Sequence, residues 1–120
     1  MEKEKVDILD LNIPNVCFSH AKTLPEDDER LEKFKNQRLE RGFDNTELWN
    51  LDLTIAQFIL PRMKAFKEQD YNAIENKVLD KIIRSFEMVV EKGFFTNEED
   101  IKEFQKGMKL FAKHYCELWN

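Results

Sequence analysis

The acid Asp52 lies within the most apolar stretch of this 120-residue chain, where a carboxylate could do chemistry. At about 100° per residue of helix, Asp52 falls close to Ile59 and Met63, in the middle of the apolar stripe. A buried carboxylate needs a cationic partner or a proton. We predict an ion pair with Arg38 of the preceding helix, with Lys35 as second choice. Three alternatives stay open: a structural pair, a ligand-facing acid, and a catalytic acid or base.

A basic cluster follows further along the same stretch, at Arg62, Lys64 and Lys67. In an antiparallel bundle this end of the helix meets the end of the last helix, which carries Tyr115 and Trp119. Cations can hold phosphate groups while aromatic rings stack on a base, so the five residues predict a nucleotide-binding site. The alternative is a solvated helix end whose cations lie at the negative pole of the helix dipole.

Trp49 cannot share that site within one subunit. Thirteen residues separate it from Arg62, which corresponds to about 20 Å of helix. We expect Trp49 beside Phe94 and Phe95, or in a site completed across a dimer. Together with Asp52 it is a second candidate for ligand binding.

Other arrangements argue against metal and catalytic chemistry. Cys17-x-x-His20 and His114-x-Cys116 offer four zinc ligands, but two residues at this second spacing point about 160° apart on a helix. The sequence has no glycine-rich phosphate loop, nucleophile elbow or Ser-His-Asp set. We therefore expect no metal, no cofactor and no catalytic residue.

A row of lysines in the last helix is interpreted as a solvated face or as a surface for an acidic partner; its members are Lys102, Lys106, Lys109 and Lys113.

Helices are the elements that would position these residues. Three glycines and three prolines leave little material for hairpins, and apolar residues recur at helical spacing. Gly42 and Gly93 are predicted helix ends, and Pro61 predicts a kink within its helix. Asp44 with Glu47, Asn72 with Glu75, and Thr96 with Glu99 have the spacing of a capping box at a helix start. The predicted helices are 24–41, 44–70, 72–93 and a last one from 96.

The predicted fold is an all-α four-helix bundle with an extended N-terminal arm. The arm covers residues 1–24, with a short strand as an option, and residues 25–120 form a single helical domain. The length suits one domain. A helix as apolar as 44–70 could leave surface uncovered, which predicts a homodimer.

Composition limits the partners. The chain has 19 basic and 24 acidic residues and a net charge of −5, which disfavours nucleic acid. No signal peptide or membrane-spanning run is visible in the sequence, so we expect a cytoplasmic protein without a membrane partner. Its two cysteines are then expected to be reduced.

An ordered series of short segments lies between residues 39 and 120. It consists of GFD at 42–44, WNLDxTIA at 49–56, LPRMKxFKE at 60–68, LDKIIxxFE at 79–87, GMxLFAK at 107–113 and LW at 118–119. This series resembles small, largely uncharacterised proteins encoded by bacteriophages and related mobile elements. The resemblance implies a phage context, and with it the host cytoplasm, but no catalytic residue.

These observations lead to one functional expectation and two alternatives. We expect a non-enzymatic phage accessory protein that binds a small phosphate-bearing nucleotide signal and sequesters it in counter-defence. The alternative is a protein-binding inhibitor of a host defence enzyme. A small hydrolase is the third hypothesis.

Overall fold

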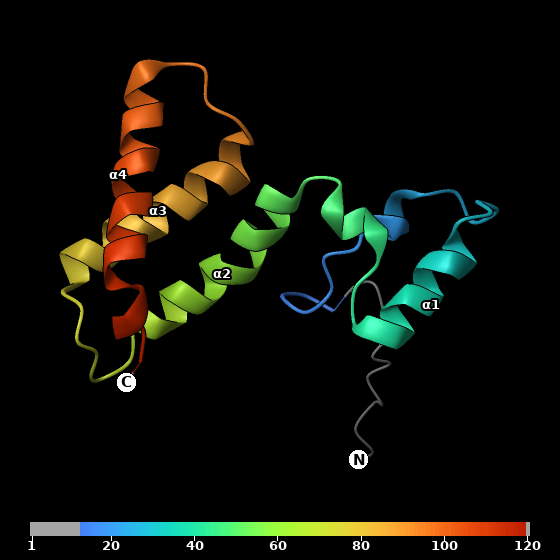
Figure 1. The fold of residues 1–120 in the computed structure, drawn as a ribbon, viewed down its shortest axis with the longest axis horizontal. Helices are drawn as coiled ribbons and strands as arrows, with labels where there is room; N and C mark the ends of the chain where they lie inside the picture. The colour runs from blue at the N-terminus through green and yellow to red at the C-terminus, as the bar shows by residue number, and fades with distance from the viewer. Residues whose placement is uncertain (1–12, 120) are drawn as a thin grey trace, which may run out of the picture. The chain divides into compact units, whose positions relative to one another are not determined.

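The computed structural model describes residues 13–119, in which the regular secondary structure is all helical, with no strand (Figure 1). The predicted all-α class, with four α-helices, is confirmed. The α-helices are α1 (Leu31–Arg41), α2 (Leu51–Lys67), α3 (Asn76–Lys92) and α4 (Glu98–His114). Three short 3-10 helices accompany them, η1 (Ala21–Thr23), η2 (Asn45–Leu48) and η3 (Tyr115–Glu117).

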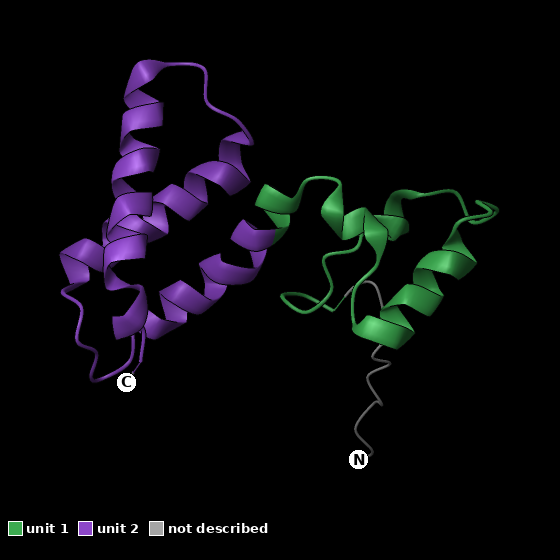
Figure 2. Cartoon of the chain, in the orientation of Figure 1, with its two compact units in different colours: residues 1–54 green, residues 55–120 purple. Residues whose placement is uncertain are grey.

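The chain divides into two compact units, residues 1–54 (unit 1) and residues 55–120 (unit 2) (Figure 2). The division falls inside α2, whereas the predicted organisation was an arm at 1–24 and one domain at 25–120. The first half of the predicted arm, residues 1–12, lies outside the described residues. Its second half contains η1, and the optional strand is absent from residues 13–24.

Unit 1 shows why α1 begins later than the sequence predicted. The Asp28 carboxylate accepts hydrogen bonds from the backbone N–H of Arg30, at 2.9 Å, and from its guanidinium. Such local side-chain bonds stabilise a turn in place of helix, so the predicted start at 24 is wrong and α1 begins at Leu31. The predicted end is confirmed, because Gly42 adopts the left-handed conformation with φ of 86°.

The predicted helix 44–70 is interrupted near its start. Asp44 and Glu47 form the predicted capping box, but the box begins the short helix η2. A turn at 49–50 then separates η2 from α2. The Thr54 hydroxyl donates to the carbonyl oxygen of Glu47 at 2.7 Å, across this break. Pro61 lies inside α2, and the kink expected there stays a prediction.

Unit 2 has one apolar core. Buried residues of α2, of α3 and of the segment between them form its centre, and half-buried residues of α4 pack against them. The buried members are Ala56, Met63, Ile74, Leu79, Ile82, Ile83, Phe86 and Val89.

The glycine signal holds at the end of α3, whereas the capping signals predicted the starts of α3 and α4 less accurately. Gly93 follows α3 as predicted. The Asn72 start is wrong, because Glu75 is the N-cap of α3. At α4 the cap is displaced by one residue: the Asn97 side chain accepts the N–H of Asp100 at 2.8 Å, in place of Thr96.

The close crossing of α3 and α4 is the feature that positions the candidate site. Gly107 of α4 lies against Ser85 and the Lys81 carbonyl of α3. The Ser85 hydroxyl, which is fully buried, donates to the Phe104 carbonyl oxygen of α4 at 2.9 Å. A glycine at the contact lets two helix backbones approach more closely than any side chain would permit.

One further observation concerns membranes. Between residues 13 and 119, no helix combines the length and the apolar composition that crossing a bilayer requires.

Candidate functional site

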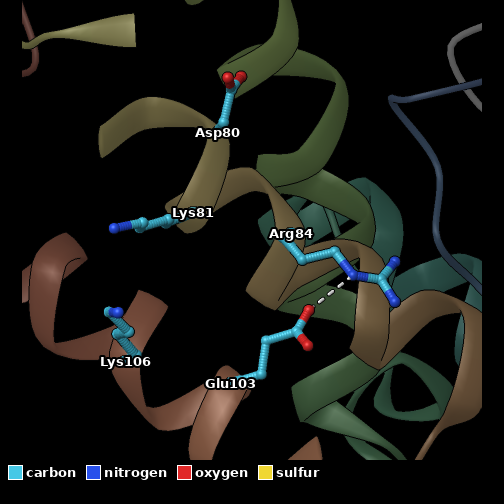
Figure 3. A pocket seen from close by; sticks show the side chains of 5 residues that line it. All are labelled: Asp80, Lys81, Arg84, Glu103 and Lys106. Atoms are coloured by element: carbon cyan, nitrogen blue, oxygen red, sulfur yellow. Dashed lines mark hydrogen bonds and ion pairs between the residues drawn. The ribbon is translucent and has the colours of Figure 1, made fainter. Parts of the chain in front are cut away.

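A cleft with a volume of about 300 Å³ opens between α3 and α4 in unit 2 (Figure 3). Charged side chains from both helices line it. From α3 come Asp80, Lys81 and Arg84, and from α4 come Glu103 and Lys106.

Both carboxylates of the cleft have cationic partners. Asp80 forms an ion pair with Lys67 of α2. Glu103 accepts from the Nε of Arg84 at 3.0 Å, and Glu91 lies 3.2 Å from the same guanidinium. The Glu103 carboxylate, followed by that of Glu91, raises the pKa of Arg84 above its ordinary value. The negative charge of the cleft is therefore compensated.

Two cations of the cleft lack such compensation. Within residues 13–119, the ammonium groups of Lys81 and Lys106 have no ion pair and no hydrogen bond to the protein. Figure 3 shows both side chains on one side of the cleft, while Arg84 extends the other way toward Glu103. Two uncompensated ammonium groups at one opening attract an anion.

The helix crossing sets the spacing of these two lysines. Lys81 supplies the carbonyl that approaches Gly107, and Lys106 is the residue before that glycine. The same backbone contact therefore joins the segments that carry both ammonium groups. A bulkier residue at 107 would separate the segments.

The chemistry that this arrangement can perform is binding. Lysine donates up to three hydrogen bonds as a compact positive charge, which suits phosphate or carboxylate oxygens. A metal would need a different donor set, and the described part of the chain holds no group of three histidine, cysteine or acidic side chains placed to ligate one.

The predicted basic cluster on α2 is arranged differently from the expectation. Lys64 lies 3.6 Å from Glu87, and Lys67 pairs with Asp80, so both contact acids of α3. The Arg62 guanidinium lies 3.9 Å from the ring centre of Phe58 and donates to the Phe58 carbonyl oxygen at 2.8 Å. Two residues of the cluster therefore pair with acids of α3, while Arg62 contacts Phe58 in the preceding turn of α2.

The predicted aromatic partners of that cluster are largely exposed. Tyr115 stacks on Phe111 with ring centres 5.6 Å apart. Trp119 is 60% exposed. Among the described contacts, no cation–π contact or hydrogen bond joins Tyr115 or Trp119 to Lys64 or Lys67. These four side chains of the expected phosphate-and-base site are therefore not joined by any of the described contacts.

The predicted pair between Asp52 and Arg38 is wrong. Asp52 is exposed in the first turn of α2, where the positive end of the helix dipole favours an acid. Arg38 pairs with Asp44 instead. The expectation assumed one helix from residue 44, so it missed that the cap of η2 places a nearer carboxylate beside Arg38.

Asp44 is the centre of a buried polar cluster in unit 1. Its carboxylate accepts from the Ser19 hydroxyl at 2.5 Å, from the Thr46 N–H at 2.8 Å and from Arg38. Burial raises the pKa of Asp44, but the hydrogen bonds from Ser19, Thr46 and Arg38 outweigh burial and hold it below its ordinary value. Because the charge is fully enclosed and satisfied, we interpret the cluster as structural.

Trp49 has neighbours other than the predicted Phe94 and Phe95. Its ring stacks on that of His20 and meets Phe34 edge-on, each at 6.2 Å between centres. The Arg30 guanidinium lies 5.9 Å from the Trp49 ring centre. The indole remains half exposed, so Trp49 belongs to a small aromatic cluster at the surface of unit 1.

The cysteines and the lysine row complete the predicted candidates. Cys17 and Cys116 are free thiols, and His114 contacts Glu117 at 2.9 Å. The four lysines of the row on α4 are all exposed, as the helical spacing predicted.

Sequence reasoning missed the cleft because it placed Lys106 in a solvated row and overlooked Lys81. A glycine inside a strongly periodic helix was the available signal, since such a glycine often marks a close packing contact. No protein-family model, curated protein or solved structure matches the chain.

Proposed function

We propose that this chain is a non-enzymatic protein that binds a small phosphate-bearing ligand in the cleft between α3 and α4. One observation carries the proposal: Lys81 and Lys106 line the cleft without an acidic partner among the described residues, while the other charged groups of the cleft are paired. A phosphate group would supply the missing negative charge and several acceptor oxygens.

This site differs from the one expected on α2. Binding a phosphate there would require Lys64 and Lys67 to leave Glu87 and Asp80, whereas Lys81 and Lys106 need break no ion pair. The cleft is therefore the better phosphate site. A nucleotide signal sequestered in phage counter-defence is the role that we propose for such binding.

The test is calorimetry with the full chain and a panel of ligands. The panel contains inorganic pyrophosphate, ADP-ribose and cyclic dinucleotides, so that phosphate recognition can be separated from recognition of a base. We expect stoichiometric binding of at least one member, with the ligand recovered intact. Turnover of the ligand would contradict the non-enzymatic proposal and favour the hydrolase.

Charge reversal locates the site. The variant K81E/K106E should lose binding by about tenfold or more, because two attractive charges become repulsive. The control K33E/K35E carries the same charge change on α1, where both lysines are exposed. Equal affinity of the two variants would show that the cleft is not the site.

A further inference from the structure

We propose that the lysine row on α4 is a docking surface for an acidic helix of a protein partner. The row consists of Lys102, Lys106, Lys109 and Lys113. This surface goes beyond the proposed phosphate cleft, with which it shares only Lys106.

The row has the geometry of a continuous stripe. Its members follow at spacings of four, three and four residues, which places them within about 60° around the helix. At 1.5 Å per residue the stripe is about 16 Å long. All four side chains are exposed, so their ammonium groups can reach a partner together.

In the described part of the chain, the lysines of the row have no acidic partner, whereas most other cations of unit 2 have one. Within the described residues, none of these four lysines forms an ion pair. The remaining cations of unit 2, apart from Lys81, are engaged. Lys64, Lys67, Lys77, Arg84 and Lys92 have acidic partners, and Arg62 packs on Phe58.

Two acids of α4 form ion pairs with cations of α3 and not with the lysine row. Glu103 contacts Arg84, and Asp100 contacts Lys92 at 2.8 Å. Both acids therefore face α3. Glu98 and Glu99, the other two acids of α4, lie exposed in its first turn. Beyond that turn, the exposed ammonium groups of the row have no ion pair within the described residues, which suits an external anionic partner.

A helix is the partner whose geometry fits best. Carboxylates at the same spacings of four, three and four residues would lie opposite the lysines along the whole stripe, as charged residues do between paired helices. A nucleic-acid strand fits less well, because the stripe carries no aromatic residue for base stacking. The net charge of −5 also opposes a long polyanion.

The direct test is a titration of the full chain with two designed peptides, followed by amide NMR shifts at low salt. One alanine-based peptide carries four glutamates in a row at the matching spacings. Its isomer has the same composition, with the glutamates distributed around the helix. We expect shifts along α4 and about fivefold tighter binding of the row peptide, with affinity falling as salt rises. Equal binding of the two peptides would overturn the proposal.

Variants separate this surface from the cleft. K109E/K113E should weaken binding of the row peptide by about tenfold, whereas K33E/K35E should not. Neither change touches Lys81 or Lys106, so pyrophosphate binding should persist in both variants. Loss of peptide binding with retained pyrophosphate binding supports a separate docking surface. Unchanged peptide binding by K109E/K113E refutes the docking surface and leaves the cleft unaffected.

A mixed-sequence single-stranded oligonucleotide serves as the competing probe. If it binds the stripe more tightly than the row peptide, the partner is a nucleic acid and the proposal is wrong. Weaker binding of the oligonucleotide at the same salt concentration supports the acidic helix.

Discussion

Replacing Gly107 with alanine should destabilise unit 2, even though alanine is the better helix former. A Cβ at this position would lie 1.7 Å from the Ser85 hydroxyl oxygen and 2.5 Å from the Lys81 carbonyl oxygen. The hydroxyl can rotate away, but the carbonyl belongs to the backbone of α3. The two helices must therefore separate to accommodate the methyl group.

The magnitude follows from three contributions. Forcing an extra methyl group into a packed contact costs about 1–3 kcal/mol. Rotation of Ser85 would also break its hydrogen bond to Phe104, at about 1 kcal/mol. Removing a glycine from a helix interior returns about 1 kcal/mol. We therefore expect the free energy of unfolding to fall by about 1–3 kcal/mol.

Urea unfolding followed by circular dichroism measures this loss, and amide exchange in α3 assigns it to unit 2. Gln105→Ala is the matched control, because Gln105 is exposed on the same helix and its substitution should change stability by about 0.5 kcal/mol or less. If Gly107→Ala is as stable as the parent or more stable, helix propensity dominates and the argument from close approach is refuted. The variant should also bind pyrophosphate more weakly, since Lys81 and Lys106 would move apart.

Three further predictions concern unit 1 and the start of α2. Asp44→Asn should lower its unfolding free energy by about 3 kcal/mol, because Arg38 would stay buried without its counter-charge; amide exchange in η2 measures the loss. Since folding lowers the pKa of Asp44 below the ordinary 3.8, its contribution is complete above that pH and is lost as pH falls through the folded pKa. The Trp49 indole resonance should shift as unit 1 loosens at acid pH. If Asp44→Asn showed the same pH profile as the parent protein, Asp44 would not be the cause of the loosening. Asp52→Asn should change the melting temperature little, because Asp52 is exposed, and a large loss would restore the predicted structural role of this acid.

Much of the helical fold could be predicted from local rules. Apolar periodicity identified all four helices, and Gly42 and Gly93 marked two of their ends, because both signals act within a few residues. The residues at which helices begin were harder to predict, since a polar side chain can either cap a helix or stabilise a turn that precedes it. Asp28 does the latter, so α1 begins at Leu31.

The candidate site was harder to predict from local sequence rules than the helices were. Asp44 and Asp52 both follow Arg38 closely enough in the sequence to be its ion-pair partner. Arg38 pairs with Asp44, and this choice depends on the break between η2 and α2. The cleft depends on which residues of α3 and α4 cross. A helical wheel gives the face of each helix but not the height at which two faces meet, so Lys81 and Lys106 could not be paired from periodicity alone.

The crossing at Gly107 also has a consequence for the order of folding. Only residues 93–97 connect α3 to α4, so closing this helical hairpin costs little chain entropy. Contacts between neighbours in sequence form quickly, whereas distant ones must wait for longer loops to close. The contact between Ser85 and Gly107 should therefore belong to an early structured element. The two lysines of the cleft would then be brought together before the more distant parts of the chain have folded.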